Sequence, residues 1–264
     1  MTPTKIPIQM IVTDLDRTLL RTDKTISEYT AATLKACQQS GIKVVFATAR
    51  PKRAATHFCT SVPVDALALH NGAVVFIGDE CIHNSGIAPD TTKYILRTIN
   101  AINPDATLSA EVDDNLYANF DVSVHWGNIA VTHTDFSDIP NKPADKIIVG
   151  VSGLEEIKRY ADILPDDLYI ELSDGKLGLI MKKTATKWAA VQTLGKRFDI
   201  PTSNIIAFGD DYNDVGMLHG CGLGIAMANA IDECKVNADY ICDTNDNDGV
   251  AKWLAKNVLR YAHL

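Results

Sequence analysis

Acidic and hydroxyl side chains gather at three places in this sequence, each directly after a short apolar run. The three segments are Asp14-Leu15-Asp16-Arg17-Thr18, Thr48-Ala49-Arg50 and Gly209-Asp210-Asp211-Tyr212-Asn213-Asp214. If the apolar runs form parallel strands, these segments meet at the carboxyl edge of the sheet, where ligands bind in open α/β folds. Carboxylates converging there would repel one another unless a cation lay among them. Hard oxygen donors, with neither histidine nor cysteine nearby, favour Mg²⁺.

A carboxylate at the end of a strand can also be a helix N-cap, and each segment taken alone fits that structural role. Three strand ends of similar composition are harder to explain as caps. We therefore expect one site that holds a magnesium ion among carboxylates, and the charge of that ion would allow this acidic protein to bind a small anionic substrate.

The elements that would position these segments alternate between strand and helix. Before residue 84 we expect strands at 8–13, 43–47 and 66–69, a helix between the N-cap Ser27 and the stop at Gly41, and a helix opening at Pro51. After residue 181 we expect a helix from Thr186, strands at 204–208 and 223–226, a helix near Asp214 and a closing helix from Gly249. This order predicts a parallel sheet with helices on both faces.

The middle third of the chain has a different pattern. We expect helices from Pro89 and Leu154, paired strands within 107–119, and strands at 146–151, 168–172 and 177–181. The sequence thus predicts an α/β protein with a Rossmann-like parallel-sheet core in two pieces, residues 1–83 and 182–264. An independent α+β domain, residues 84–181, is inserted between them.

Composition narrows the classes of partner. The chain has 264 residues, 46% of them hydrophobic and 22% charged, and its formal net charge is −8. This acidic balance argues against nucleic acid or an anionic membrane as the main partner. The six cysteines are scattered without a CxxC pair, and most of them are expected to be buried apolar residues. Neither a leader in Met1–Gln9 nor a long apolar span is evident. We expect a cytoplasmic protein; the sequence says nothing of its oligomeric state.

The motifs resemble those of the haloacid dehalogenase superfamily. Asp14-Leu15-Asp16-Arg17-Thr18 is similar to its DxDxT signature, and Thr48, Lys187 and the run from Gly209 to Asp214 are similar to its second, third and fourth motifs, in the same order. The His70-Asn71-Gly72-Ala73 segment and the long insertion resemble the Cof-type branch of sugar-phosphatase-like hydrolases.

The resemblance implies a role for each motif residue. Asp14 would be the nucleophile that forms an aspartyl-phosphate. Asp16 would protonate the leaving alcohol and then activate water, while its backbone carbonyl would bind the metal. Asp14, Asp210 and Asp214 would supply carboxylates to Mg²⁺. Thr48 and Lys187 would hold the phosphate oxygens.

Further residues are candidates for binding the substrate or completing the site. They are Arg50, Asn71 and Asn213, with Asp211 near the metal, and in the inserted domain, as a cap, Glu111, Asp113 and His125. Among three nearby lysines we choose Lys187 because Trp188-Ala189-Ala190-Val191 continues into a helix. The chain departs from the family pattern in having Arg17, Ala49 and Trp188 where glycine is common.

The resulting hypothesis is a magnesium-dependent phosphatase that hydrolyses a small phosphorylated metabolite, a sugar phosphate or a similar phosphomonoester. A phosphomutase would use the same nucleophile. A receiver-like signalling module would share the aspartate, threonine and lysine, but it is usually about half this length. A non-catalytic sensor of a phosphorylated metabolite would not need both Asp14 and Asp16. The sequence does not identify the metabolite.

Overall fold

The structure is a computed structural model that describes residues 7–173 and 175–259. The chain divides into two compact units, one of Met1–His83 with Thr186–Leu264 and one of Asn84–Ala185. The second boundary falls at Thr186 rather than at residue 182, because the turn after Lys182 is bonded within the second unit: Lys183 N–H donates to Asp167 at 2.9 Å. Most of the segment Met1–Gln9, where we sought a leader, lies outside the described residues.

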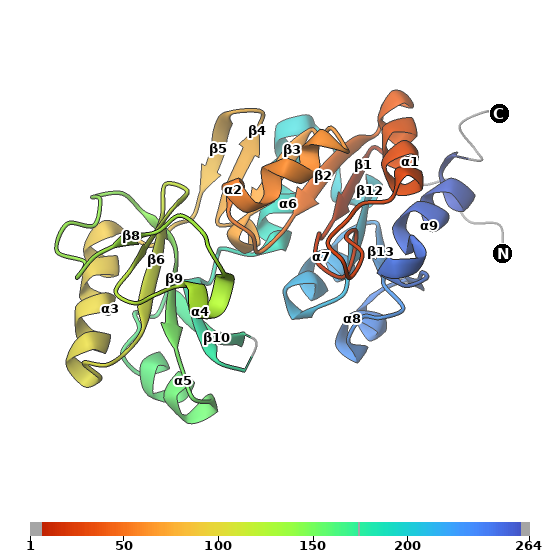
Figure 1. Ribbon diagram of the computed structural model, residues 1–264. Helices are drawn as coiled ribbons and strands as arrows, with labels where there is room; N and C mark the ends of the chain where they lie inside the picture. The colour runs from red at the N-terminus through yellow and green to blue at the C-terminus, as the bar shows by residue number, and fades with distance from the viewer. Residues whose placement is uncertain (1–6, 174, 260–264) are drawn as a thin grey trace. The chain divides into compact units, whose positions relative to one another are not determined.

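The first unit is built on an eight-stranded sheet of order β14-β13-β12-β1-β2-β3-β4-β5 (Figure 1). Its strands are β1 (Met10–Thr13), β2 (Lys43–Ala47), β3 (Ala66–Leu69), β4 (Val74–Ile77), β5 (Glu80–Asn84), β12 (Ile205–Gly209), β13 (Leu223–Ala226) and β14 (Tyr240–Ile241). The pairs from β14 to β3 are parallel, and β4 runs antiparallel to β3. The result is the α/β fold with a parallel-strand core that the sequence predicted.

Helices and short 3-10 turns connect these strands. They are α1 (Glu28–Gln39), α2 (Lys52–Ala55), η1 (Thr56–Thr60), η2 (His70–Gly72), α6 (Lys187–Phe198), η3 (Thr202–Asn204), η4 (Tyr212–Asp214), α7 (Val215–Gly220), α8 (Asp232–Asn237), η5 (Asn245–Asn247) and α9 (Gly249–Asn257). Ser27 caps α1 by accepting a hydrogen bond from Thr30 N–H at 3.0 Å, and Gly41 follows that helix with φ +85°. The start and stop signals in the sequence therefore act as expected.

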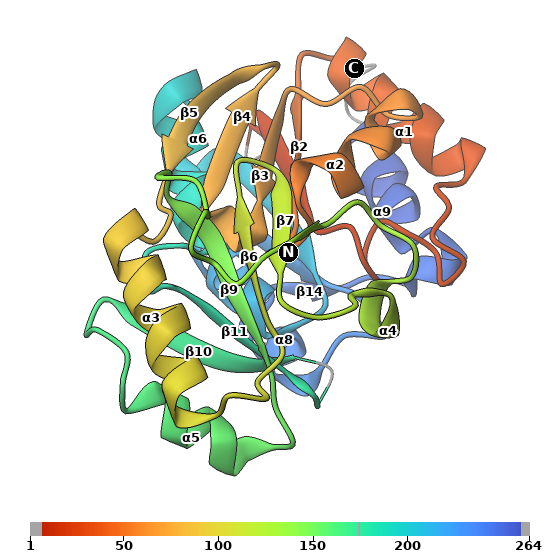
Figure 2. The ribbon, with the colours of Figure 1, turned by 60° about the vertical axis from the view of Figure 1, so that its left-hand side comes forward.

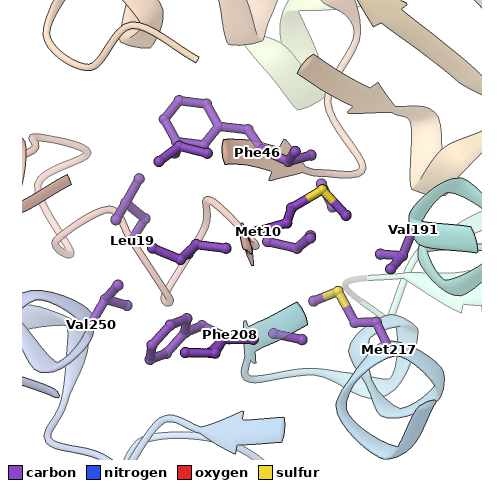
Figure 3. Close-up of a cluster of buried hydrophobic side chains, with 14 of the residues drawn as sticks. Met10, Leu19, Phe46, Val191, Phe208, Met217 and Val250 are labelled. Atoms are coloured by element: carbon purple, nitrogen blue, oxygen red, sulfur yellow. The ribbon is translucent and has the colours of Figure 1, made fainter. Parts of the chain in front are cut away.

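Apolar side chains from both helical layers meet the central strands. Met10, Phe46 and Phe208, on β1, β2 and β12, are fully buried. Figure 3 shows Val191 and Met217, from α6 and α7, on one side of these side chains and Leu19 and Val250 on the other. Strands covered on both faces are apolar along their whole length, which explains the continuous apolar runs in the sequence.

The second unit is a six-stranded sheet of order β10-β11-β9-β6-β7-β8, antiparallel except between β7 and β8. Its elements are α3 (Pro89–Ile102), β6 (Leu108–Val112), β7 (Asn115–Ala118), α4 (Ser123–Trp126), β8 (Thr132–His133), β9 (Ala144–Gly150), α5 (Leu154–Ala161), β10 (Leu168–Ser173) and β11 (Leu177–Lys182). Figure 2 shows α3 and α5 alongside this sheet, and their buried side chains join Ala110 and Ile147 in one apolar cluster.

Several short elements were not predicted. The β4–β5 hairpin is among them, although Val74–Ile77 is an apolar run followed by the turn residues Gly78 and Asp79. The helix α8 and the two-residue strand β14 are too short to show periodicity. In the part of the chain that the structure describes, every helix is too short or too polar to span a lipid bilayer.

Candidate active site

The motifs lie at the carboxyl ends of three adjacent strands, β12, β1 and β2. Thr13, the last residue of β1, pairs in register with Phe208 on one side and Phe46 on the other. Asp14 follows Thr13 and donates its backbone N–H to the Phe208 carbonyl at 3.1 Å. Thr48 follows β2 and Asp210 follows β12, so the sheet register places the three motifs side by side.

Lys187 connects two of these carboxylates. It is the first residue of α6, whose N-cap Thr186 accepts a hydrogen bond from Ala189 N–H at 3.1 Å. The Lys187 side chain is 1% exposed, and its Nζ lies 2.6 Å from Oδ1 of Asp14 and 2.6 Å from Oδ1 of Asp214. Burial alone would lower the pKa of Lys187, but the two carboxylates outweigh it and raise the pKa, so the ammonium stays charged.

Asp214 is fixed by its own loop. Its Oδ2 accepts hydrogen bonds from the backbone N–H groups of Asp210 at 2.9 Å and Asp211 at 3.1 Å. Gly209 makes this fold-back possible, because a Cβ there would lie 2.4 Å from the Asp214 Cβ. Asp214 is fully buried, and both of its oxygens have donors.

Asp210 is the third carboxylate of the cluster. Its Oδ1 accepts a hydrogen bond from Thr18 Oγ1 at 2.7 Å, and its Oδ2 lies 3.6 Å from Nε of Arg17. Oxygens of Asp14, Asp210 and Asp214 all lie within 4.8 Å of one another. The pKa of Asp210 is raised to about 6, chiefly because the group is buried and because Asp214 lies nearby.

The donor set fits a hard divalent cation. All three groups are carboxylates, which are the ligands that Mg²⁺ prefers over softer nitrogen or sulfur donors. Burial raises the pKa of Asp14 to about 8, with the negative charge of Asp214 adding to the effect. The Lys187 ammonium alone thus does not balance three close carboxylates, and a cation would restore their ionisation.

Asp16 lies apart from this cluster and is held by two cations. Arg50 donates to both carboxylate oxygens, from Nε at 2.6 Å and Nη2 at 2.7 Å, and Lys24 donates from Nζ at 2.7 Å. Burial raises the pKa of Asp16, but these hydrogen bonds outweigh it and hold the pKa at about 2. The side chain is therefore a carboxylate in this arrangement.

The His70-Asn71-Gly72 turn links the second and fourth motifs. All three residues have positive φ, at 48°, 58° and 94°. Asn71 N–H donates to the Thr48 carbonyl at 3.0 Å, and the Asn71 Oδ1 accepts from Asn213 Nδ2 at 2.9 Å. Asn71 is buried beside the site, and non-glycine residues with positive φ often cluster at functional sites.

The predicted site residues of the first unit fall into linked groups. Asp14, Asp210, Asp214 and Lys187 form the buried centre; Asp16 and Arg50 form an ion pair; and Asn71 and Asn213 join through their amides. Thr48 is 1% exposed, and its Oγ1 accepts from Arg50 N–H at 3.2 Å. Of the other two lysines considered, Lys182 lies 4.0 Å from Asp167 in the second unit, and Lys183 is exposed.

The three candidates of the second unit have unlike surroundings. Glu111 is buried on β6, opposite Lys146 of β9 in the strand register. Asp113 is exposed at the β6–β7 turn and pairs with Lys142, and His125 is on α4. Their substrate role stays a prediction.

Two contacts of the site were missed by the sequence reasoning. Lys24 reaches Asp16 from a loop in which it has φ +66°, and no spacing in the sequence indicates that contact. Thr18 was part of the recognised motif but was given no role; its hydroxyl bonds Asp210. The threonine at the end of the DxDxT motif was the signal in the sequence that could have indicated this contact.

Comparison with known proteins agrees with this geometry. The haloacid dehalogenase-like hydrolase family matches residues 11–254. A Bacillus subtilis 5-amino-6-(5-phospho-D-ribitylamino)uracil phosphatase, YitU, is 29% identical, over 93% of this chain and 96% of that protein. A second B. subtilis phosphatase of the same description, YcsE, is 25% identical, over 96% and 97%.

The fold also matches solved structures. The phosphatase BT1666 from Bacteroides thetaiotaomicron superposes with a TM-score of 0.83 at 23% identity, covering 97% of each chain. The likeness covers both units, so each unit shares its fold with that protein.

Proposed function

The chain belongs to the haloacid dehalogenase-like hydrolases and is a phosphatase that acts on phosphorylated substrates, and from this premise we propose that it is magnesium-dependent and forms an aspartyl-phosphate on Asp14. The observation that carries the proposal is the buried Asp14 carboxylate, 2.6 Å from the Lys187 ammonium and within 4.8 Å of two further carboxylates. This is an anionic nucleophile in surroundings that favour a phosphate dianion once a cation is bound.

Asp14 attacks the phosphorus atom in the first step. One carboxylate oxygen forms a bond to phosphorus as the bond to the leaving alkoxide breaks, and the alkoxide takes a proton from Asp16. In the second step water attacks the same phosphorus, Asp16 accepts the water proton, and Asp14 is released with inorganic phosphate.

The ionised and the protonated forms of the Asp16 side chain require different surroundings. The carboxylate held by Arg50 and Lys24 is the form that accepts a proton from water. The acid form, which protonates the leaving oxygen, requires these ion pairs to weaken when substrate binds. Asp16 is 36% exposed, which leaves room for that movement.

Asp14, Asp210 and Asp214 would hold Mg²⁺, with the Asp16 backbone carbonyl as the further ligand that the family resemblance implies. When bound, the ion supplies positive charge that neutralises the phosphate and lets an anionic nucleophile approach it. Asp214 also orients Lys187, since one of its oxygens accepts from that ammonium.

Lys187 and Thr48 would hold the non-transferring phosphate oxygens. A buried ammonium and a hydroxyl stabilise charge that develops on those oxygens in the transition state. Arg50, Asn71 and Asn213 lie around them and would contact the remainder of the substrate.

The substrate proposed is a sugar phosphate or a similar small phosphomonoester. The names of YitU and YcsE give a phosphoribityl compound as their substrate, which combines a polyhydroxyl chain with a terminal phosphate. We propose the second unit as a cap that selects among such leaving groups, with Glu111, Asp113 and His125 as its candidate contacts.

The direct test is phosphate release from a panel of phosphorylated metabolites. Hexose phosphates, ribityl phosphates, pyridoxal phosphate, flavin mononucleotide and nucleotides would be assayed with Mg²⁺ or with EDTA, for the wild type and Asp14→Asn. We expect release that requires both Mg²⁺ and Asp14. Phosphate release that persists in EDTA would refute the requirement for a metal ion. Phosphate release by Asp14→Asn would refute the assignment of Asp14 as the nucleophile.

A further inference from the structure

Trp188 stands directly after Lys187, where the family commonly has glycine. Its side chain is partly buried against the core of the first unit. The indole lies against α7, the helix that directly follows Asp214. Trp188 thus packs the beginning of the helix that carries Lys187 against the helix that directly follows Asp214, one of the two carboxylate partners of Lys187.

Two glycines of α7 make room for the indole. A Cβ at Gly220 would lie 2.6 Å from Cζ2, 2.7 Å from Cη2 and 2.8 Å from Cε2 of Trp188. A Cβ at Gly216 would lie 3.3 Å from the Trp188 Cβ. Both glycines belong to a helix and neither has positive φ, so backbone conformation does not explain them. Glycine costs up to about 1 kcal/mol relative to alanine in a helix interior, so it needs a reason there. The close approach of the indole supplies that reason at Gly220.

The buried centre depends on how α6 and α7 sit against each other. Lys187 Nζ lies 2.6 Å from Asp214 Oδ1, and Asp214 is 0% exposed, so a small shift of either helix would lengthen this contact. On the opposite side of the helix start, Gly72 lies so close that a Cβ there would be 2.2 Å from the Thr186 carbonyl oxygen. The first turn of α6 is therefore confined from two directions.

We infer that Trp188, seated on Gly216 and Gly220, is a positioning residue that sets the place of Lys187 between Asp14 and Asp214. The indole touches none of the reacting groups and acts through the alignment of two helices. The inference rests on the proposed function, because it assigns the alignment a role in the transfer of phosphate.

Kinetics of Trp188→Ala and Trp188→Phe with p-nitrophenyl phosphate and Mg²⁺ test the inference. Displacements near 1 Å can cost up to about 100-fold in rate. We expect Trp188→Ala to lower kcat by at least about 10-fold with KM changed less than about threefold, and Trp188→Phe to restore most of kcat, since transition-state positioning acts on kcat. The matched control is Phe198→Ala, an aromatic residue at the far end of the same helix that also packs on the core. Its kcat should stay within about twofold of the wild type.

A double-mutant cycle with Gly220→Ala tests the contact itself. In the wild-type background the new Cβ displaces the indole, so kcat should fall. In the Trp188→Ala background there is no ring to displace, so the same change should leave kcat unaltered. Losses that multiply independently would overturn the inference, as would an unchanged kcat in Trp188→Ala.

An activity-independent readout separates this inference from the proposed function. The rate at which an acylating reagent modifies Lys187, followed by peptide mass spectrometry, reports its protection, since the side chain is 1% exposed. Trp188→Ala should raise that rate by about 10-fold relative to Phe198→Ala. If the wild type releases no phosphate, the proposed function fails while this measurement still tests the alignment. Equal acylation rates in the two variants would overturn the inference.

Discussion

A single buried ammonium group holds two of the three carboxylates of the site together. Lys187 bonds Asp14 and Asp214, while Asp210 is stabilised instead by the Thr18 hydroxyl and lies near the exposed Arg17. One buried cation among three carboxylates leaves negative charge uncompensated. The pKa values of Asp14 and Asp210 are raised chiefly by burial, and the nearby charge of Asp214 adds to the effect. At this scale the residues fit the second cation that we propose.

Removal of metal should make stability depend on pH. Burial raises the pKa of Asp210 to about 6 and that of Asp14 to about 8, against an ordinary value of 3.8. Because both are raised, their protonation stabilises the fold fully below about pH 4, and this contribution is lost as pH rises through about 6 and 8. We expect the urea midpoint in EDTA to fall from pH 5 to pH 8, with Mg²⁺ reducing the fall. A urea midpoint in EDTA that does not change with pH would contradict this account. So would a pH dependence of the midpoint that is the same in Asp210→Asn as in the wild type.

Arg17 has a backbone conformation that suits glycine, since its φ is +60°. We expect Arg17→Gly to stabilise the protein by about 0.5–1 kcal/mol, because relief of the left-handed conformation exceeds the added freedom of the unfolded chain. Arg17→Ala removes the same side chain but retains the strained backbone, and it should give no gain. Urea unfolding in EDTA and in Mg²⁺ measures both variants; an equal gain for alanine would place the effect in the side chain.

At the scale of elements, the site is assembled by strand ends and by the first turn of one helix. Strands β12, β1 and β2 bring three motifs to one edge of the sheet, and α6 brings Lys187 to them from the other half of the sequence. The His70-Asn71-Gly72 turn contacts both the Thr48 loop and Asn213. Each strand therefore contributes to the site the residues that follow its end, and α6 contributes the first residue of the helix.

Gly72 gives a prediction at this scale. Gly72→Ala places a Cβ 2.2 Å from the Thr186 carbonyl oxygen, so the start of α6 with Lys187, or the turn that carries Asn71, must shift. We expect kcat to fall by at least about 10-fold. Gly78→Ala is the matched control, because Gly78 also has positive φ, +57°, but open space around its Cβ position. The Gly78→Ala variant should be less stable than the wild type but should keep its kcat. Comparable reductions of kcat in both variants would refute the steric argument.

The sequence predicted the main elements because their signals are local. Ser27, Gly41 and Thr186 act as caps or stops, and the apolar runs ending at Asp14 and Asp210 are buried strands. The contacts of Lys24 with Asp16 and of Trp188 with Gly220 are tertiary and join segments with no common pattern. Strand β14 has two residues and is too short to show periodicity.

At the scale of the whole molecule, the chain comprises two units with different sheets. One is a largely parallel sheet that carries the proposed catalytic residues, and the other is a mostly antiparallel sheet with buried charged residues of its own. The family match extends across both units, over residues 11–254. Recognition of the family and of phosphatase activity from the motifs is confirmed by that match and by the named relatives.

Asp145 gives the second unit its own pH dependence. This residue of β9 is 6% exposed, and burial together with the nearby Glu111 raises its pKa to about 7. The raised pKa means that protonated Asp145 stabilises the fold, and this stability is lost as pH rises through about 7. We expect the free energy of unfolding of Asp145→Asn to exceed that of the wild type by about 1–3 kcal/mol at pH 8. Near pH 4 the two free energies should be equal. A difference independent of pH, measured by urea unfolding, would contradict the assignment.

The most direct test of the central claim is to identify the residue that carries the phosphoryl group. Asp16→Asn would be mixed with Mg²⁺ and p-nitrophenyl phosphate, whose leaving group departs without a proton from Asp16, so that only the water step is blocked. The mixture would be quenched and reduced with borohydride, which converts an aspartyl-phosphate to homoserine, before peptide mass spectrometry. The account predicts homoserine at position 14, dependent on substrate and Mg²⁺ and absent from the Asp14→Asn variant. Turnover by the wild type with no modified Asp14, or homoserine at another aspartate, would contradict it.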